Sequence, residues 1–180
     1  STPDPSGLMN KKTLSERDIC TQYITPAIAA AQWNNELQMR EEVRLTDGRV
    51  VVRGQTGRRD KNSIRRADYV LYYKPGLPLA VVEAKDNNHS MRDGIQQALD
   101  YAAMLDVPFA FSSNGDGFVF HDRTRTDGTL ETEIALSEFP SPEELWQRYL
   151  AWKGIGADIA PAYAQDYHNT GKQPRYYQTT

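Results

Sequence analysis

Two carboxylates and one amine stand at the ends of two neighbouring apolar segments of the sequence. Asp68 precedes the β-branched and aromatic run 69–73, and Glu83 and Lys85 follow the apolar run 79–82. Runs of this length and composition predict β-strands. The three polar residues would therefore lie at strand ends, where side chains that perform chemistry can meet.

The short connection between these runs predicts that they pair antiparallel. Lys74-Pro75-Gly76 supplies turn-forming residues, and antiparallel pairing brings the beginning of the first strand beside the end of the second. Asp68 and Glu83 then become neighbours. Because side chains alternate along a strand, Glu83 and Lys85 share one face, while Ala84 points into the opposite layer.

Two adjacent carboxylates repel each other unless a cation lies between them. Hard oxygen ligands favour Mg²⁺ or Mn²⁺, which bind through one or two carboxylates, water and a substrate phosphate. Lys85 is placed to orient or deprotonate an attacking water, or to stabilise charge on the phosphate. Each residue alone has an ordinary explanation, such as a solvated strand end or an exposed ion pair. Together, Asp68, Glu83 and Lys85 predict metal-dependent cleavage of a phosphodiester bond.

A helix that follows the second strand is expected to carry two more polar side chains. Ser90 is a plausible cap for a helix over residues 91–105. Gln97 and Tyr101 are four residues apart and so lie one above the other on its surface. They are candidates to contact the phosphate backbone or to support Lys85, and the alternative is an amide and a phenol at the edge of the core.

Cations are concentrated in the segment that leads into the first strand. Residues 49–66 contain seven Arg and Lys side chains and one acid, Asp60. If they share a face they would attract phosphate, and if they do not, they form a solvated loop. Arg59, Arg65 and Arg66 are the candidate DNA contacts, the last two because the strand carries them to the site.

The remaining pattern predicts an α/β fold. A helix is expected from about residue 14, capped by Thr13 or Ser15 and interrupted at Pro26, and another begins after Ser141. Further strands are expected over residues 42–46, 49–53, 107–111 and 118–122, with turns at 47–48 and 112–117. This order fits a mixed sheet with helices on its faces, in which the strands at 79–82 and 107–111 run parallel through a right-handed crossover.

Composition indicates one globular domain. The chain has 180 residues, 39% of them hydrophobic, and a formal net charge of −3. It has no run of about eighteen apolar residues, and residues 1–7 lack the apolar core of a signal peptide. Cys20 is the only cysteine, which excludes an internal disulfide and a cysteine zinc cluster. We therefore expect a cytoplasmic protein with no membrane segment.

These motifs, taken in order, resemble a known nuclease superfamily. The spacing D-x14-E-A-K is similar to the PD-(D/E)xK signature, with Ala67 where the pattern often has Pro, and Gln97 to Tyr101 is similar to the Q-x3-Y element of the RecB-like branch. A closer resemblance is to the amino-terminal nuclease domain of the R (restriction, motor) subunit of type I restriction enzymes. It is carried over roughly residues 14–122 by A-D-Y-V-L, P-L-A-V-V-E-A-K, Q-Q-A-L-D-Y-A and S-S-N-G.

The resemblance implies a restriction-endonuclease-like three-layer α/β/α fold with a central mixed sheet. It implies a DNA endonuclease that uses Mg²⁺, for which Mn²⁺ can substitute, held by Asp68, Glu83 and the backbone carbonyl of Ala84. Glu16 in the first helix is an additional candidate ligand, or alternatively a first-turn acid favoured by the helix dipole. Lys85 would position the attacking water, and the Q-x3-Y pair would steady that water or the phosphate.

The resemblance also implies a domain plan and partners. Residues 1–13 are expected to be disordered or a cloning remnant, residues 14–153 to form the nuclease domain, and residues 154–180 to be a linker to an absent ATPase/helicase motor. R-Y-Y-Q at residues 175–178 is similar to the entry to that motor, and the sequence has no phosphate loop, so ATP use would belong to the motor. Double-stranded DNA would be cut without base readout, since recognition lies in a specificity subunit that acts with a methylation subunit.

Two other functions fit the same residues. One is a stand-alone resolvase or repair nuclease with the same active site. The other is a catalytically inactive DNA-binding or docking domain that retains the fold.

Overall fold

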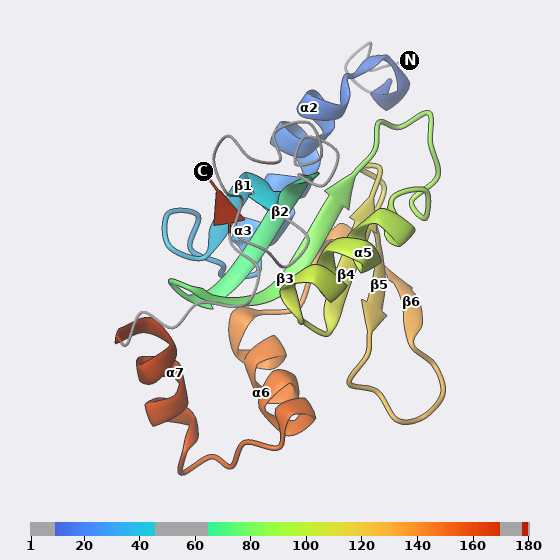
Figure 1. The fold of residues 1–180 in the computed structure, drawn as a ribbon. Helices are drawn as coiled ribbons and strands as arrows, with labels where there is room; N and C mark the ends of the chain where they lie inside the picture. Colours follow the sequence, from blue (N-terminus) through green and yellow to red (C-terminus); the bar gives the residue numbers. More distant parts are fainter. Residues whose placement is uncertain (1–9, 46–64, 170–177, 180) are drawn as a thin grey trace, which may run out of the picture.

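A seven-stranded mixed sheet organises the computed structural model, which describes residues 10–45, 65–169 and 178–179 (Figure 1). The strands are β1 (Met39–Leu45), β2 (Arg65–Lys74), β3 (Leu77–Ala84), β4 (Phe109–Ser113), β5 (Phe118–Asp122), β6 (Glu131–Ile134) and β7 (Gln178–Thr179). Their order is β6-β5-β4-β3-β2-β1-β7. The β2–β3 pair is antiparallel and the β3–β4 pair is parallel, as the sequence predicted.

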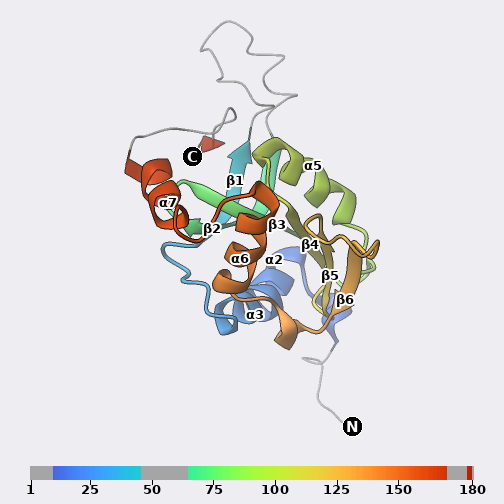
Figure 2. The ribbon, with the colours of Figure 1, turned by 90° about the horizontal axis from the view of Figure 1, so that it is seen from below.

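Helices cover both faces of this sheet. They are η1 (Lys11–Thr13), α2 (Glu16–Ile19), η2 (Cys20–Ile24), α3 (Thr25–Ala30), α5 (Ile95–Leu105), η3 (Leu136–Glu138), α6 (Pro142–Lys153) and α7 (Ala160–Asn169). One buried cluster lies under α5, and a larger one lies under α2, α3, α6 and α7 on the other face (Figure 2). The three-layer α/β/α prediction is confirmed. None of the helices in the described ranges is long and apolar enough to cross a lipid bilayer.

The first helical segment shows how Pro26 is accommodated. Ser15 is its N-cap, and its hydroxyl accepts a hydrogen bond from the amide of Asp18 at 3.0 Å. The π-helical turn η2 then separates α2 from α3, and Pro26 falls in the first turn of α3. Proline is tolerated there because a first-turn residue needs no helical N–H bond. The predicted interruption is confirmed, with Ser15 rather than Thr13 as the cap.

Two predicted boundaries are wrong. The helix expected from residue 91 begins at Ile95, because the Ser90 hydroxyl donates to the Asp93 carboxylate at 2.9 Å and forms a separate turn, and Gly94 becomes the cap. The turn expected from residue 112 begins after Ser113, since β4 continues to that residue between β3 and β5. The strand expected over 42–46 is β1, whereas its hairpin partner at 49–53 lies outside the described residues.

Two segments expected to lie outside the folded domain contain packed structure. Within the expected loose terminus, the Lys11 and Lys12 amines donate to the carbonyls of Gly115 and Asn87 at 3.1 and 3.0 Å. Within the expected linker, α7 buries Ala160 and Ala164 in the larger cluster. The folded unit therefore extends beyond residues 14–153 at both ends.

In β1 and β2, the apolar side chains switch from one face of the sheet to the other next to the predicted site. Met39 packs in the larger cluster and Val43 in the cluster under α5, although residues four apart on a regular strand share a face. Glu42 lies between them with a φ of 53°, in the left-handed region. The ladder pairs on either side place it opposite Asp68. The register stays one-for-one across this irregularity, which thus coincides with the first predicted site residue.

Candidate active site

The carboxylates of Asp68 and Glu83 are held by each other's strands. The amide of Asp68 donates to Glu83 Oε2, and the amide of Ala84 donates to Asp68 Oδ2, both at 2.8 Å. The last Cα pair of the β2–β3 ladder is Tyr69 with Val82. Beyond it, side-chain carboxylates rather than backbone carbonyls accept the hydrogen bonds of the strand amides. The predicted meeting of the two acids is therefore present, and backbone hydrogen bonds fix both of them.

Burial changes the protonation of both acids. Glu83 is only 3% exposed, and this burial, followed by the charge of Asp68, raises its pKa to about 9. Burial also raises the pKa of Asp68, although the Ala84 amide opposes that shift. In the protein without a cation, the pair therefore retains a proton at neutral pH. A hard divalent cation would replace that proton, so the donor set fits the predicted ion.

Glu83 and Lys85 share a face, and Ala84 packs on the other. A methyl group placed on Gly94 at the start of α5 would lie 3.3 Å from Cβ of Glu83 and 3.6 Å from Cγ of Lys85. Ala84 instead belongs to the larger cluster. Lys85 is half-buried, and none of the described residues pairs with its amine at hydrogen-bond or salt-bridge distance. The amine is near enough to Asp68 to lower that residue's pKa.

Gln97 and Tyr101 form a pair on the side of α5 that faces the acids. The Gln97 amide donates to the Tyr101 hydroxyl at 3.0 Å. Burial raises the pKa of Tyr101, as do the negative charges of Glu83 and Asp68, so the phenol lies within electrostatic range of both acids. The two side chains lie one above the other on the helix, as expected, while their catalytic role stays a prediction.

Glu16 lies at the edge of the site. Its pKa is raised, first by partial burial and then by the charge of Asp68, while Lys85 opposes the shift. Across the parts of the chain that the structure describes, no three His, Cys, Asp or Glu side chains are grouped so that they could hold a metal ion. Glu16 therefore does not complete a three-residue set here, and its role as a ligand stays a prediction.

The candidate DNA contacts separate into two positions. Arg65 and Arg66 are exposed at the start of β2. Arg65 lowers the pKa of Tyr101 and so lies on the side of the acids, whereas Arg66 pairs with Glu42 at 3.8 Å. Arg59 lies outside the described residues.

Sequence reasoning missed two residues that touch the site. A Cβ on Gly94 would meet Glu83 and Lys85, so the glycine lies beside them, and the buried Ser112 hydroxyl accepts from the Gly94 amide at 3.1 Å. A signal was present, because Ser112 is a polar residue directly after the apolar run 107–111. Its neighbours Ser113 to Gly115 form a stronger turn pattern, which obscures the single buried hydroxyl.

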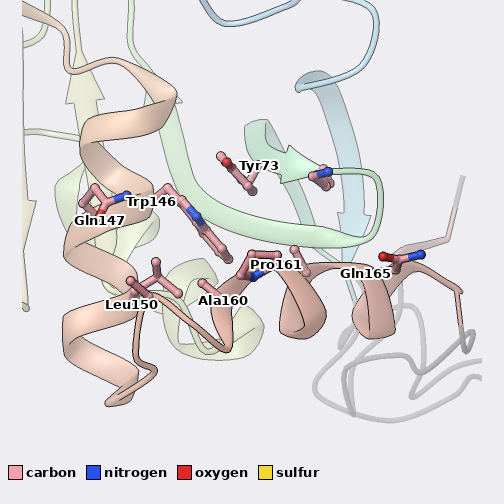
Figure 3. Close-up of a pocket in the computed structure, with 10 residues that line it drawn as sticks. Tyr73, Trp146, Gln147, Leu150, Ala160, Pro161 and Gln165 are labelled. Atoms are coloured by element: carbon pink, nitrogen blue, oxygen red, sulfur yellow. The ribbon is translucent and has the colours of Figure 1, made fainter.

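A hollow of about 630 Å³ lies between α6 and α7 (Figure 3). Tyr73, Trp146, Leu150 and Pro161 line it, and Tyr73 stacks on Trp146 with ring centroids 4.1 Å apart. Tyr73 is five residues along β2 from Asp68, which corresponds to about 17 Å in an extended strand. This hollow is therefore not part of the acid site.

Comparison with known proteins was consistent across sequence and structure. Residues 34–129 match the family model for the type I restriction enzyme R protein N terminus. The chain is 50% identical over 173 residues to the type I restriction enzyme EcoAI endonuclease subunit of Escherichia coli, which covers 94% of this chain and 21% of that protein. The fragment structure of a putative HsdR subunit of a type I restriction enzyme from Vibrio vulnificus YJ016 is similar with a TM-score of 0.68 and 37% identity. That match covers 87% of this chain and 29% of the solved one.

Proposed function

Since this chain belongs to the family of type I restriction enzyme R protein N termini, we propose that it is the DNA-cutting domain of such an enzyme and that Asp68, Glu83 and Lys85 form its active site. The substrate is double-stranded DNA, hydrolysed with Mg²⁺ and without base readout by this domain. The chain spans about a fifth of the length of the curated relative. ATP-driven translocation and assembly with methylation and specificity subunits are proposed for the whole protein.

The observation that carries the proposal is the reciprocal bonding of the two acids. Amides of Asp68 and Ala84 bind the carboxylates at 2.8 Å and hold them at the open end of β2 and β3. Burying two acids side by side costs free energy unless a cation or proton compensates. Such a costly arrangement, at a strand end and beside an amine that none of the described residues pairs with, is typical of a functional site, and its groups suit hydrolysis of a phosphodiester.

Each side chain of the proposed active site has a separate role. Asp68, Glu83 and the carbonyl of Ala84 would hold Mg²⁺, which when bound supplies a Lewis acid for the phosphate and lowers the pKa of water. The Lys85 amine orients the attacking water or stabilises negative charge on a phosphate oxygen. The Tyr101 hydroxyl, which accepts from Gln97, keeps its own proton to donate toward a phosphate oxygen or water.

Asp68→Asn and Glu83→Gln test the assignment in the complete restriction complex. Each variant keeps an oxygen that can accept the amide hydrogen bond but removes the charge that a divalent cation needs. We expect strand cleavage to fall by at least about 100-fold, because a lost ligand removes charge stabilisation of several kcal/mol. Cleavage is measured on a DNA substrate with a single recognition site, and ATP hydrolysis is measured in parallel.

Asp116→Asn is the matched control. Asp116 is an exposed carboxylate that pairs with Lys11 at 3.1 Å and has no contact with the acids. This variant should cut at the wild-type rate, and all three should hydrolyse ATP normally. Undiminished cutting by Asp68→Asn or Glu83→Gln would contradict the active-site assignment and favour an inactive DNA-binding or docking domain.

A further inference from the structure

Four buried polar residues gather where β4 meets the connection between Lys85 and α5. Asn87, Ser112, Ser113 and Asn114 are each at most 7% exposed. A buried polar group costs free energy unless its hydrogen bonds are made, so a cluster of them in an apolar sheet needs an explanation. Here every member is bonded, and three of the four bond to the connection or belong to it.

The Ser112 hydroxyl makes the two bonds that fix the end of this connection. It accepts from the Gly94 amide at 3.1 Å and donates to the Met91 carbonyl at 2.5 Å. With both bonds made, the hydroxyl has one orientation and holds the turn over residues 91–94 against the sheet. Asn114 holds the other part of the connection, where its amide donates to the His89 carbonyl at 2.6 Å.

The clamped turn brings Gly94 against the two reactive side chains. A Cβ at this position would lie 3.0 Å from Ser112 Oγ, 3.3 Å from Glu83 Cβ and 3.6 Å from Lys85 Cγ. Gly94 has a φ of −94°, which any residue adopts, so backbone conformation does not require glycine here. The physical reason that remains is close approach, first to the Ser112 hydroxyl and then to Cβ of Glu83, with Lys85 at ordinary contact distance.

We propose that Ser112 and Gly94 are positioning residues that set the rotamers of Glu83 and Lys85. Ser112 fixes the turn, and the absence of a side chain on Gly94 leaves the space that Cβ of Glu83 and Cγ of Lys85 need. The proposal rests on the proposed function, because it assigns these residues to the same active site. A displacement of about 1 Å at a reacting group can reduce a rate by about 100-fold, so a small change in this space has a measurable effect.

A purely structural role predicts a different result. If Gly94 and Ser112 only cap α5, then Gly94→Ala should lower the melting temperature, because its Cβ would lie 3.0 Å from Ser112 Oγ, but should leave cleavage by the folded protein untouched. Ser112→Ala should lower the melting temperature without changing the pH dependence of cleavage. Rates and pH profiles therefore separate positioning from simple capping.

Gly94→Ala and Ser112→Ala are compared with Ser113→Ala in the complete restriction complex. Ser113 is the same residue type, equally buried and next in the strand, but its hydroxyl accepts from the Gly115 amide at 3.0 Å and not from Gly94. Single-turnover cleavage is followed from pH 6 to pH 9, together with KM for DNA. Melting temperature and Mn²⁺ affinity are measured on this chain.

Positioning predicts that Gly94→Ala and Ser112→Ala lower the cleavage rate constant by about tenfold or more with KM little changed. Both should also shift the pH profile and weaken Mn²⁺ binding, whereas Ser113→Ala changes melting temperature alone. Cleavage at the wild-type rate and pH profile in Gly94→Ala would overturn the proposal. So would rate losses that follow melting temperature equally in Ser112→Ala and Ser113→Ala.

The two proposals fail in distinguishable ways. If Asp68→Asn cuts DNA normally, the active site itself is misassigned. If Asp68→Asn is inactive while Gly94→Ala cuts like the wild type, only the positioning role is lost. Gly94→Ala keeps an ordinary backbone conformation but places its Cβ 3.0 Å from Ser112 Oγ, so its melting temperature is measured alongside its cleavage rate.

Discussion

The Glu83 carboxyl combines nearly complete burial with a position beside another acid. Burial and the charge of Asp68 raise its pKa to about 9, so the native protein without a cation holds a proton that the unfolded chain releases near pH 4.5. Between these values the folded state binds more protons than the unfolded state, and stability therefore falls as pH rises. The shift of Asp68 acts in the same direction.

Glu83→Gln should remove much of this pH dependence. In EDTA, we expect the wild-type melting temperature to fall between pH 5 and pH 9 and that of the variant to fall less. At pH 8 the variant should be more stable by at least about 1 kcal/mol, or roughly 2–4 °C. Differential scanning calorimetry measures both profiles. Parallel slopes in wild type and variant would show that Glu83 titrates normally.

Adding millimolar Mg²⁺ extends the same measurement to the predicted ion. A cation that binds only the folded protein raises its melting temperature, and the ionised acids bind it better as pH increases. Wild type should gain stability at pH 8, while Glu83→Gln should gain little. The result does not depend on cleavage, so it tests the ligands separately from catalysis.

Among single residues, sequence reasoning predicted those whose chemistry is visible in their type. Asp68, Glu83 and Lys85 were recognised because strand alternation and antiparallel pairing fix where their side chains lie. Ser112 and Gly94 were not, because their importance depends on the contact between β4 and the turn before α5. That contact is between residues 18 apart in the chain, and no local pattern encodes it.

At the scale of elements, α7 shows where pattern analysis fails. Residues 160–169 contain few large apolar side chains, so they read as a linker, yet Ala160 and Ala164 are buried in the larger cluster. Small side chains give a weak periodic signal but allow a helix to approach the sheet closely. By contrast, α6 was predicted because Ser141 and Pro142 begin it, and its cap bond from the Glu144 amide is present at 3.2 Å.

Ala164→Glu tests whether α7 belongs to the folded unit. Ala164 is 3% exposed, and a buried, unpaired carboxylate should destabilise the protein by about 2–4 kcal/mol. Gln165→Glu adds the same charge at the next, exposed position and should change stability by less than about 0.5 kcal/mol. Urea unfolding measures both. Equal stability of the two variants would show that α7 does not pack as described.

At the scale of the whole molecule, charge is distributed unevenly. The chain has a formal net charge of −3, so bulk attraction to DNA is weak and the proposed binding would depend on local cations. Arg65 is exposed on the side of the acids, where a phosphate approaching Asp68 and Lys85 would meet it. The fold was predictable because each strand and helix is marked by a local sequence pattern. The surface that would bind DNA was not, because it depends on which cations lie on the same face of the folded protein.

Arg65→Ala should weaken DNA binding in a salt-dependent way. If Arg65 contacts one phosphate, the slope of log affinity against log salt should decrease by about 1. Arg123 is also exposed and follows Asp122, which pairs with Phe109 at the start of β4, away from the Ser113 end. Arg123→Ala should therefore leave the slope unchanged. Fluorescence anisotropy with a short duplex at several salt concentrations measures both. Equal slopes for wild type and Arg65→Ala would exclude this contact.

The left-handed conformation of Glu42 has a consequence for transplanting this site into another scaffold. On either side of the Glu42 and Asp68 positions, β1 and β2 direct their apolar side chains toward opposite layers. In a recipient sheet whose side chains alternate faces without interruption, the apolar side chains in half of each grafted strand would point into the wrong layer. An engineer who copies only the acids and the amine would therefore lose the geometry, and the irregular residue on the adjacent strand must be copied with them.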